Sequence, residues 1–279
     1  MKTAPFLGQR VLITGASSGI GAAIALHLAD LGARVGIIAR RSERIAALEA
    51  RINSLGDPVV EAPRAVAAVA DVSRDGSVEA AIDRIRAKLG PIDQVVACAG
   101  YDQFGDFASL TIADYRRQLE TNVFGVLRTL YAVLGDLRSR RGVFAVVGSV
   151  SCHLSPPGHT AYSMSKHALR ALAEAARIEL GREGVGVVLV SPGLVSTEIR
   201  KRGDDGDYQA GAPDPLPAWL QLPPERVARA AARAMLRRKA EVVVGFTGRL
   251  AVGLARLCPW LLRLVLRLSP PVPRPGGVP

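Results

Sequence analysis

The sequence has few of the residues that build metal centres, disulfide frameworks or membrane-spanning helices. Its 279 residues include three Cys and four His. Cys98, Cys152 and Cys258 lack metal-ligand spacing and the His residues do not cluster with acids, so we expect no metal site and reduced thiols in a cytoplasmic setting. No apolar run reaches the length of a spanning helix without interruption, and the short stretch before the first expected strand does not resemble a signal peptide.

Acidic residues are scarce toward the C-terminus. Residues 221–279 hold eleven Lys and Arg against Glu225 and Glu241, a net charge of +9, which leaves only +2 of the total +11 for the residues before them. The basic character therefore belongs to the tail. It predicts contact between the tail and an anionic surface and argues against a nucleic-acid-binding core.

Apolar runs alternate with helical periodicity along most of the chain, which is long enough to bury a large core. We expect strands at 9–14, 33–39, 66–70, 93–98, 143–148, 185–190 and 241–245. We expect helices at 19–31, 42–53 with Ser42 as its cap, 75–89, 111–137, 160–180 and 223–238. Continuous Val, Ile and Ala in strands that alternate with helices predict an α/β fold, a doubly wound seven-stranded parallel sheet with helices on both faces.

A glycine-rich turn, Thr-Gly-Ala-Ser-Ser-Gly-Ile-Gly, follows the first expected strand at 14–21. Its three glycines allow a tight turn, close approach of backbone to a pyrophosphate, and close packing of the next helix, whose free N–H groups hold phosphates. Such glycines also occur for packing alone. The position between the first strand and the first helix favours a dinucleotide site.

The end of the second expected strand lacks the carboxylate that binds the ribose hydroxyls of NAD. Arg40 and Arg41 follow it instead. Guanidinium groups suit a 2′-phosphate, so we expect NADP(H) in preference to NAD(H). We expect Arg40, nearer the strand, to be the main ligand; Arg41 could instead be a solvated charge at the start of a helix.

A hydroxyl, a phenol and an amine follow the fifth expected strand. Tyr162 comes thirteen positions after Ser149, and Lys166 four positions after Tyr162. A helix that begins near Thr160 places Tyr162 and Lys166 on one face. The ammonium would then lower the pKa of Tyr162 from about 10 towards neutrality, which suits acid–base work. The alternative is a surface Tyr and a solvated Lys.

With Asp71-Val72, Ala99-Gly100, Asn122 and Ser191-Pro192-Gly193 followed by Thr197, these motifs resemble the short-chain dehydrogenase/reductase family in its single-domain form. They occur in family order over residues 9–199. The resemblance implies a Rossmann-type fold, hydride transfer between a nicotinamide cofactor and a carbonyl or alcohol, and the catalytic residues Asn122, Ser149, Tyr162 and Lys166. The implied cofactor residues are Gly15, Ser17, Ser18, Gly19, Ile20, Gly21, Arg40, Arg41, Asp71, Val72, Ala99, Gly100, Tyr162, Lys166, Pro192, Gly193, Val195 and Thr197.

The resemblance also implies roles. Tyr162 would exchange a proton with the substrate oxygen, Lys166 would lower the pKa of Tyr162 and bind the nicotinamide ribose, and Ser149 would stabilise developing charge. Asn122 would hold a water that links Lys166 to solvent. The helices that contain Asn122 and Tyr162 pair subunits in the family, which implies a homodimer or homotetramer. The residues expected to border the substrate are Tyr101, Ser151, Cys152 and His153, the last of which could be an ordinary loop residue.

One segment departs from the family pattern. The family's Asn-Asn-Ala-Gly appears as Ala-Cys-Ala-Gly at 97–100. The amides that help brace the central strands are absent, while the glycine that lets the cofactor approach is present. We interpret this as a structural variation that leaves Cys98 a small buried apolar residue.

Two segments outside the regular alternation bear on the substrate. Residues 200–222, within the catalytic domain 1–245, are rich in Gly, Asp and Pro and predict a mobile lid, or else a disordered insertion. The extension 246–279 carries Arg249, Arg256, Arg263 and Arg267 among apolar residues, and Pro259 predicts a break into two amphipathic helices. It could contact an anionic membrane surface, the inner face included, through 246–268, cover the substrate pocket, or contact a partner subunit.

An apolar lid and tail favour a hydrophobic carbonyl or alcohol as substrate, such as a keto lipid, fatty aldehyde or steroid-like molecule. The layout resembles that of ketosphinganine reductases within the family. Two alternatives remain open: an NAD-using alcohol or steroid dehydrogenase, and a membrane-peripheral cofactor-binding protein without turnover.

Overall fold

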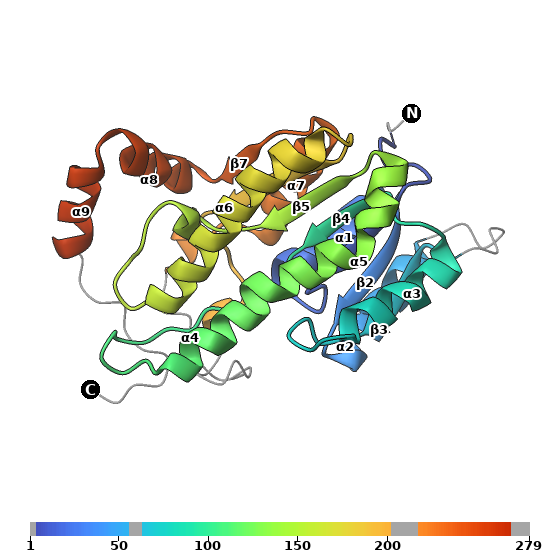
Figure 1. The fold of residues 1–279 in the computed structure, drawn as a ribbon, viewed down its shortest axis with the longest axis horizontal. Helices are drawn as coiled ribbons and strands as arrows, with labels where there is room; N and C mark the ends of the chain where they lie inside the picture. Colours follow the sequence, from blue (N-terminus) through green and yellow to red (C-terminus); the bar gives the residue numbers. More distant parts are fainter. Residues whose placement is uncertain (1–3, 56–62, 202–216, 269–279) are drawn as a thin grey trace.

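The computed structural model describes residues 4–55, 63–201 and 217–268. Seven parallel strands form one sheet in the order β3-β2-β1-β4-β5-β6-β7 (Figure 1). The strands are β1 Arg10–Thr14, β2 Arg34–Ala39, β3 Ala65–Val69, β4 Gln94–Ala97, β5 Val143–Val147, β6 Gly186–Pro192 and β7 Glu241–Val244. The predicted doubly wound parallel sheet is confirmed. Successive connections step outward from β1 through β2 and β3, and then from β4 on the other side.

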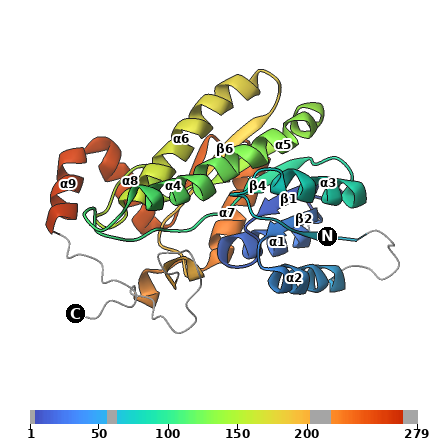
Figure 2. The same cartoon turned by 60° about the horizontal axis from the view of Figure 1, so that its bottom comes forward.

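Helices cover both faces of the sheet (Figure 2). The helices on one face are α1 Gly19–Asp30, α2 Ser42–Ser54 and α7 Pro224–Leu236. Those on the other face are α3 Ser77–Leu89, α5 Gly125–Arg140 and α6 Thr160–Gly181. Each face therefore has its own apolar core, as strands without a polar side require.

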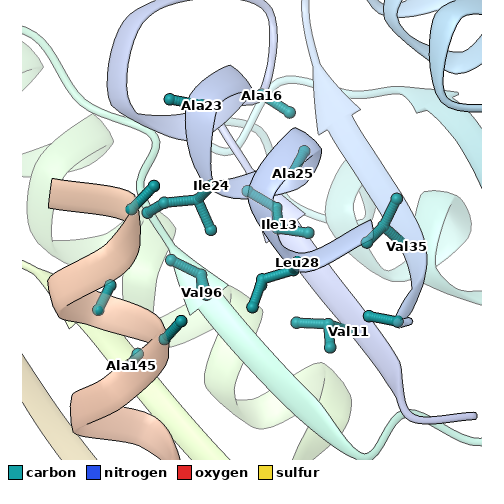
Figure 3. Packing of buried hydrophobic residues seen from close by; sticks show 14 of the residues in the cluster. Val11, Ile13, Ala16, Ala23, Ile24, Ala25, Leu28, Val35, Val96 and Ala145 are labelled. Carbon is teal, nitrogen blue, oxygen red and sulfur yellow. The ribbon is translucent and has the colours of Figure 1, made fainter. Parts of the chain in front are cut away.

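The packing of α1 shows how the first core forms (Figure 3). Ile24 and Leu28 lie one turn apart on the helix and are 1% and 0% exposed. Leu28 lies between Val11 of β1 and Val96 of β4. Burial of one such side chain stabilises the fold by about 2 kcal/mol, so this contact holds the last turns of α1 against β1 and β4.

The helix expected over 111–137 is interrupted. Thr111 caps α4 Ile112–Leu119 in a capping box with Asp114, but residues Glu120–Phe124 form a π-helical turn, η1, before α5 begins at Gly125. A π turn inserts one extra residue and is common at functional sites. Here the turn contains Asn122, whose side chain is fully buried.

The predicted cap of the second helix is also wrong. Ser42 is the first residue of α2, and Arg41 occupies the N-cap position without a side-chain hydrogen bond to the helix. The Arg41 side chain points elsewhere, as described below, because it bonds the glycine-rich turn.

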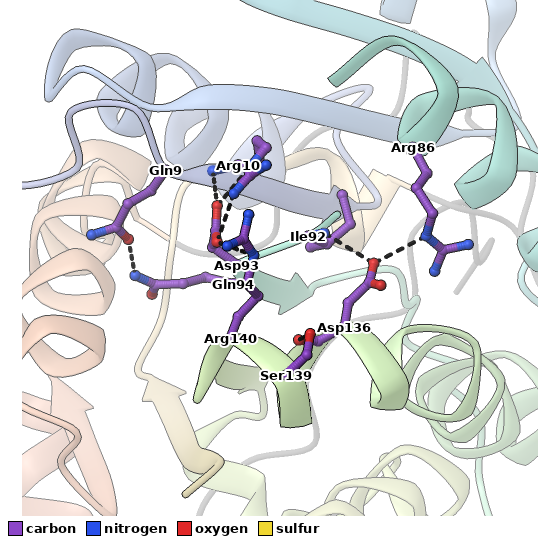
Figure 4. Close-up of polar contacts among 9 residues, drawn as sticks. All are labelled: Gln9, Arg10, Arg86, Ile92, Asp93, Gln94, Asp136, Ser139 and Arg140. Carbon is purple, nitrogen blue, oxygen red and sulfur yellow. Dashed lines mark hydrogen bonds and ion pairs between the residues drawn. The ribbon is translucent and has the colours of Figure 1, made fainter. Parts of the chain in front are cut away.

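Charged side chains bind together the amino ends of the central strands (Figure 4). Asp93 accepts hydrogen bonds from the Arg10 backbone N–H at 2.8 Å and the Arg10 Nε at 2.7 Å. Asp136 of α5 accepts from the Ile92 backbone N–H at 2.9 Å and from Arg86 Nε at 3.0 Å. These contacts lie at the edge of the sheet opposite the carboxyl ends, so they stabilise the scaffold and leave the other edge for ligands.

Two helices follow β7, α8 Phe246–Leu257 and α9 Pro259–Leu268, with the expected break at Pro259. In Figures 1 and 2 α9 lies at the edge of the molecule farthest from α2 and α3. No helix in the described part of the chain is long and apolar enough to cross a bilayer.

Part of the predicted lid at 200–222 lies outside the described residues. Its described end is anchored to the segment after β6, because the Leu222 N–H donates to Leu194 O at 2.8 Å and the Ser196 N–H to Leu222 O at 2.9 Å.

Candidate active site

A cavity of about 500 Å³ opens at the carboxyl ends of the strands, where the connections from β1 and from β4 diverge. Ligands of open α/β sheets bind at this switch point. All the predicted cofactor residues line the cavity, and so do Ser149, Tyr101 and Ser151. The motifs after six different strands, β1 to β6, are therefore brought together.

The glycine-rich turn is packed so closely that side chains would not fit. Gly15 has φ +71°, and a Cβ there would lie 2.7 Å from Ala99 Cα. A Cβ on Gly21 would lie 2.4 Å from Gly15 O. The backbone N–H groups at the start of α1 are thereby left open to the cavity, which fits the pyrophosphate of a dinucleotide.

A hydroxyl braces this turn where the family pattern has amides. Thr14 Oγ1 accepts hydrogen bonds from the backbone N–H groups of Cys98 at 3.1 Å and Ala99 at 3.2 Å. The bonds join the ends of β1 and β4 without the missing Asn side chains. Desolvation raises the pKa of the Cys98 thiol to about 12. The residue is only partly buried and lines the cavity, so the expected burial is incomplete.

Arg41, expected to be the lesser ligand, is the arginine that faces the turn. Its guanidinium donates to Ser17 Oγ at 2.8 Å, to Ser18 Oγ at 2.6 Å and to Glu198 Oε2 at 2.9 Å. Arg44 donates to Glu198 Oε1 at 2.7 Å. The Arg40 side chain is 58% exposed and lies 4.0 Å from Asp71.

Glu198 is a site residue that the sequence did not indicate. Burial alone would raise the pKa of its carboxyl, but hydrogen bonds from Arg41 and Arg44 hold that pKa below its usual value. The Glu198 carboxylate therefore already neutralises charge on the Arg41 and Arg44 guanidinium groups.

Ser149, Tyr162 and Lys166 come together at the other end of the cavity. Ser149 follows β5 and accepts from the Ser151 backbone N–H at 3.1 Å at the start of the 3₁₀ turn η2, Val150–Cys152. Tyr162 and Lys166 lie on one face of α6, with Lys166 Nζ 5.4 Å from the centroid of the Tyr162 ring. Both side chains are buried, and Lys166 Nζ donates to Val147 O at 3.0 Å.

The expected lowering of the Tyr162 pKa is wrong for this structure. Burial raises the pKa of Tyr162 well above its usual value, the charge of Asp102 raises it further, and a hydrogen bond with Ser149 only partly opposes them. Burial also lowers the pKa of Lys166. Desolvation thus outweighs the ammonium–phenol attraction and keeps Tyr162 protonated.

Asn122 does not line the cavity but lies directly behind it. Its Nδ2 donates to Tyr101 O and to Ser165 Oγ, both at 3.0 Å, and its Oδ1 accepts from the Tyr101 backbone N–H at 3.1 Å. The amide thus ties the loop after β4 to α6, the helix of Tyr162. Its predicted role in holding a water stays a prediction.

Two of the residues expected to border the substrate lie elsewhere. Cys152 is fully buried, and its sulfur packs under Gly148. His153 points away from the cavity, where its Nε2 lies 2.6 Å from Glu241 Oε1 and its Nδ1 2.8 Å from Arg170. The 3₁₀ turn after Ser149 rotates successive side chains to different sides, which places Ser151 at the cavity and these two behind it.

Glu241, at the start of β7, connects the His153 side chain to the C-terminal helices. It accepts from Ser191 Oγ at 2.8 Å and from Arg256 of α8 at 2.6 Å, in addition to His153. Burial would raise its pKa, but the bonds from His153 and Ser191, with Arg256, bring it down to about 2. No local motif marked Glu241, because its partners come from three distant segments.

A second acid–imidazole pair lies inside the cavity. Asp102 and His159 both line it, with His159 Nδ1 3.0 Å from Asp102 Oδ2. The Gly105 N–H donates to Gly158 O at 2.9 Å beside this pair. Together these contacts hold the loop after β4 against the start of α6, and so shape the wall next to Tyr162.

A glycine-rich turn, a cavity at the switch point of the sheet and a buried Tyr–Lys–Ser group are typical of dinucleotide-binding α/β proteins. Residues 9–207 match the model of the short chain dehydrogenase family. The chain belongs to this family.

The similar proteins include lipid and steroid enzymes. The chain is 37% identical to 3-ketodihydrosphingosine reductase of Bos taurus over 66% of this chain and 56% of that protein. It is 34% identical to 11-beta-hydroxysteroid dehydrogenase 1A of Arabidopsis thaliana over 73% of this chain and 56% of that protein. The chain thus spans just over half the length of these two relatives.

A solved structure shows the same fold. The alcohol dehydrogenase of the archaeon Thermococcus sibiricus, complexed with 5-hydroxy-NADP, is 29% identical, with a TM-score of 0.72 over 85% of this chain and 95% of that one.

Proposed function

We propose that this protein is an NADP(H)-dependent oxidoreductase that interconverts a hydrophobic, lipid-like carbonyl compound and its alcohol, with Tyr162 as general acid and base. The observation that carries the proposal is the buried group of Ser149, Tyr162 and Lys166 in the same cavity as the glycine-rich turn. The nicotinamide supplies the hydride when bound; the residues bind, orient and move a proton.

The roles follow from the geometry. Tyr162, kept protonated by burial, donates its proton to the carbonyl oxygen in reduction and recovers it in the reverse direction. Ser149 hydrogen-bonds the same oxygen and stabilises charge as it develops. Lys166, already held by Val147 O, stabilises the phenolate that Tyr162 becomes and binds ribose hydroxyls. Asn122 holds the Tyr101 loop and α6 in register.

The preference for NADP(H) rests on three arginines at the adenosine end of the cavity. Arg41 and Arg44 converge on one carboxylate with hydrogen-bonding geometry, and Arg40 reaches the same end from the surface. A 2′-phosphate would replace the Glu198 carboxylate on the two guanidinium groups. NAD(H) is the second candidate, because Glu198 already neutralises this site.

The substrate class follows from the lining at the Tyr162 end. Its apolar side chains come from the loop after β4, the segment after Ser149, the end of β6 and α8, and include Phe104, Leu154, Pro156, Leu194 and Ala251. Such a lining favours an apolar molecule with one carbonyl. The relatives named for a ketodihydrosphingosine and for a hydroxysteroid support this class; a steroid-type alcohol oxidised with NAD is the alternative.

A substrate panel tests the proposal. Purified protein is incubated with NADPH or NADH and with long-chain ketones, steroid ketones and small polar ketones, and loss of cofactor absorbance is followed. We expect turnover of long-chain or steroid ketones and a higher kcat/KM with NADPH. Turnover of small polar ketones alone would contradict the substrate class, and no turnover with any carbonyl or alcohol would favour a cofactor-binding protein without catalysis.

Assembly and compartment are part of the proposal. We place the protein in the cytoplasm, where its three free cysteines stay reduced. We expect a homodimer or homotetramer that pairs through α5 and α6, because exposed apolar residues such as Tyr131 and Ile178 lie on these helices. Mass measurement in solution checks this expectation.

A further inference from the structure

Helix α8 has an inner side that belongs to the active-site cavity. Thr247, Gly248 and Ala251 line the cavity, and Val252 is only 3% exposed. A Cβ on Gly248 would lie 3.1 Å from Val150 Cγ1 and 3.3 Å from Gly193 Cα. The helix therefore lies directly against the segments that follow β5 and β6, and Arg256 fastens it to Glu241.

The outer side of α8 and most of α9 are apolar and uncovered. No residue of α9 is buried. Large side chains stand in solvent along both helices, with exposed fractions of 75% for Phe246, 56% for Leu250, 84% for Leu257, 65% for Trp260 and 75% for Leu268. Contiguous apolar surface of this kind marks an interaction site in soluble domains.

The charge on this surface is of one sign. Residues 246–268 contain no Asp or Glu and include Arg249, Arg263 and Arg267, besides Arg256, which is paired with Glu241. Long Arg side chains can lie along apolar surface while their guanidinium groups reach outward. A surface with exposed Trp, Phe and Leu and with Arg as its charged groups is complementary to anionic phospholipid headgroups above acyl chains.

We propose that α8 and α9, the docking helices, bind the surface of an anionic bilayer and lie in its interface. The two helices are 12 and 10 residues long. At these lengths neither spans the hydrocarbon core, which takes about 20 residues, so they lie along the surface. A second copy of the chain fits less well, because face-to-face pairing brings Arg against Arg with no carboxylate on either surface.

Membrane docking places the cavity beside the lipid. The same helix that presents Leu250 and Phe246 outward contributes Thr247, Gly248 and Ala251 to the cavity wall. A hydrophobic substrate could then pass from the bilayer to the cavity along α8 without crossing water. This step rests on the proposed hydrophobic substrate; the docking itself does not.

Vesicle flotation of the full chain, without substrate or cofactor, tests the docking. One set of vesicles contains phosphatidylcholine alone and the other also contains phosphatidylserine. The test variant is Leu257→Ser with Trp260→Ser, and the control is Leu55→Ser, which changes a residue that is 52% exposed at the end of α2. Circular dichroism confirms that each variant is folded.

We expect the wild type and Leu55→Ser to float with phosphatidylserine vesicles. The double variant should bind the vesicles about tenfold more weakly, because buried apolar area drives interfacial binding. Arg263→Glu with Arg267→Glu should remove the dependence on phosphatidylserine. Equal flotation of the wild type and the double variant, or none for either, would overturn the proposal. An oligomer that the double variant dissociates, without vesicle binding, would identify a subunit interface instead. Because flotation needs no turnover, its result is independent of the enzyme assay.

Discussion

The cofactor end and the substrate end of the cavity are built differently. The cofactor end consists of turns that directly follow strands, and it is rich in glycine. A Cβ on Gly15 would overlap the backbone of Ala99, and a Cβ on Gly21 would overlap Gly15 O. The substrate end is assembled from η2, the start of α6, the segment after β6 and α8, held by side chains such as Glu241 that bridge distant segments.

The comparison separates two kinds of constraint. At the cofactor end, close approach of backbones dictates residue type at fixed spacing, so the chemistry is visible in a short motif. At the substrate end many side chains could line an apolar wall, and what matters is that long-range contacts hold α8 in place. Variants at the two ends should therefore fail in different ways.

The largest effect is expected at the cofactor end. Gly15→Ala puts a Cβ 2.7 Å from backbone atoms of Ala99 at a positive φ. We expect the free energy of unfolding to fall by about 3 kcal/mol, from steric overlap and left-handed strain together, and dinucleotide binding to be lost. Urea unfolding and cofactor fluorescence titration measure the two effects.

Gly135→Ala on α5 is the matched control, because no heavy atom lies within 4 Å of its Cβ position. It should stabilise the helix by about 0.5 to 1 kcal/mol and leave cofactor binding unchanged. Full cofactor affinity in Gly15→Ala would show that the turn is not the close-packed cradle described here.

At the catalytic group, Lys166→Met should lower kcat by about a hundredfold or more, because the phenolate of Tyr162 loses its neighbouring charge. The protein should not become less stable, since burial of the ammonium lowers the Lys166 pKa and so opposes folding of the charged form. Steady-state kinetics and thermal unfolding separate the two effects. Lys239→Met, at an exposed position, should change neither; a loss of stability with unchanged kcat in Lys166→Met would assign Lys166 a structural role only.

At the substrate end, Glu241→Gln should act through stability and pH. The Glu241 pKa is about 2 in the fold against 4.5 for the ordinary group, so its contribution is complete above pH 4.5 and is lost as pH falls from there toward 2. We expect the variant to be less stable by about 2 kcal/mol near neutral pH and the difference to vanish in acid.

Urea unfolding at neutral and acidic pH measures this dependence. Glu174→Gln removes the carboxylate of an exposed pair with Arg170 and should have little effect at either pH. A difference for Glu241→Gln that persists unchanged at acidic pH would show that hydrogen-bond geometry, and not the carboxylate charge, holds α8.

The smallest effect is expected for Glu198→Gln, which removes the charge that competes for Arg41 and Arg44. NADPH affinity should rise by up to about tenfold, because the 2′-phosphate no longer meets a carboxylate on the same guanidinium groups, while NADH affinity should change little. Equilibrium titration with both cofactors measures the ratio, with Glu43→Gln of α2 as a control. A lower NADPH affinity would show that Glu198 positions the arginines instead of competing with phosphate.

The sequence predicted the scaffold well, because strand order in a doubly wound sheet follows from alternation and right-handed crossovers. The residues that it assigned to the cofactor all line one cavity, and their binding role stays a prediction. It missed the π-helical turn at Glu120–Phe124, since an extra residue in a helix leaves the apolar pattern intact.

The remaining misses share a physical cause. The orientation of His153, the position of Arg41 at the glycine-rich turn, and the contribution of Glu198 depend on partners up to 157 residues away. The pKa direction of Tyr162 was wrong because it depends on burial, which spacing does not report. A local motif shows which residues must lie close to backbone atoms. It does not show which charged side chains, far apart in the sequence, form ion pairs in the fold.

The central claim is that Tyr162 moves the substrate proton in an NADP(H)-dependent reaction. The most direct test compares the wild type with Tyr162→Phe in NADPH oxidation driven by a long-chain ketone, with NADPH affinity measured in parallel. The account predicts that the variant binds NADPH normally and loses about a thousandfold or more in kcat. An unchanged rate of NADPH oxidation in Tyr162→Phe would contradict it.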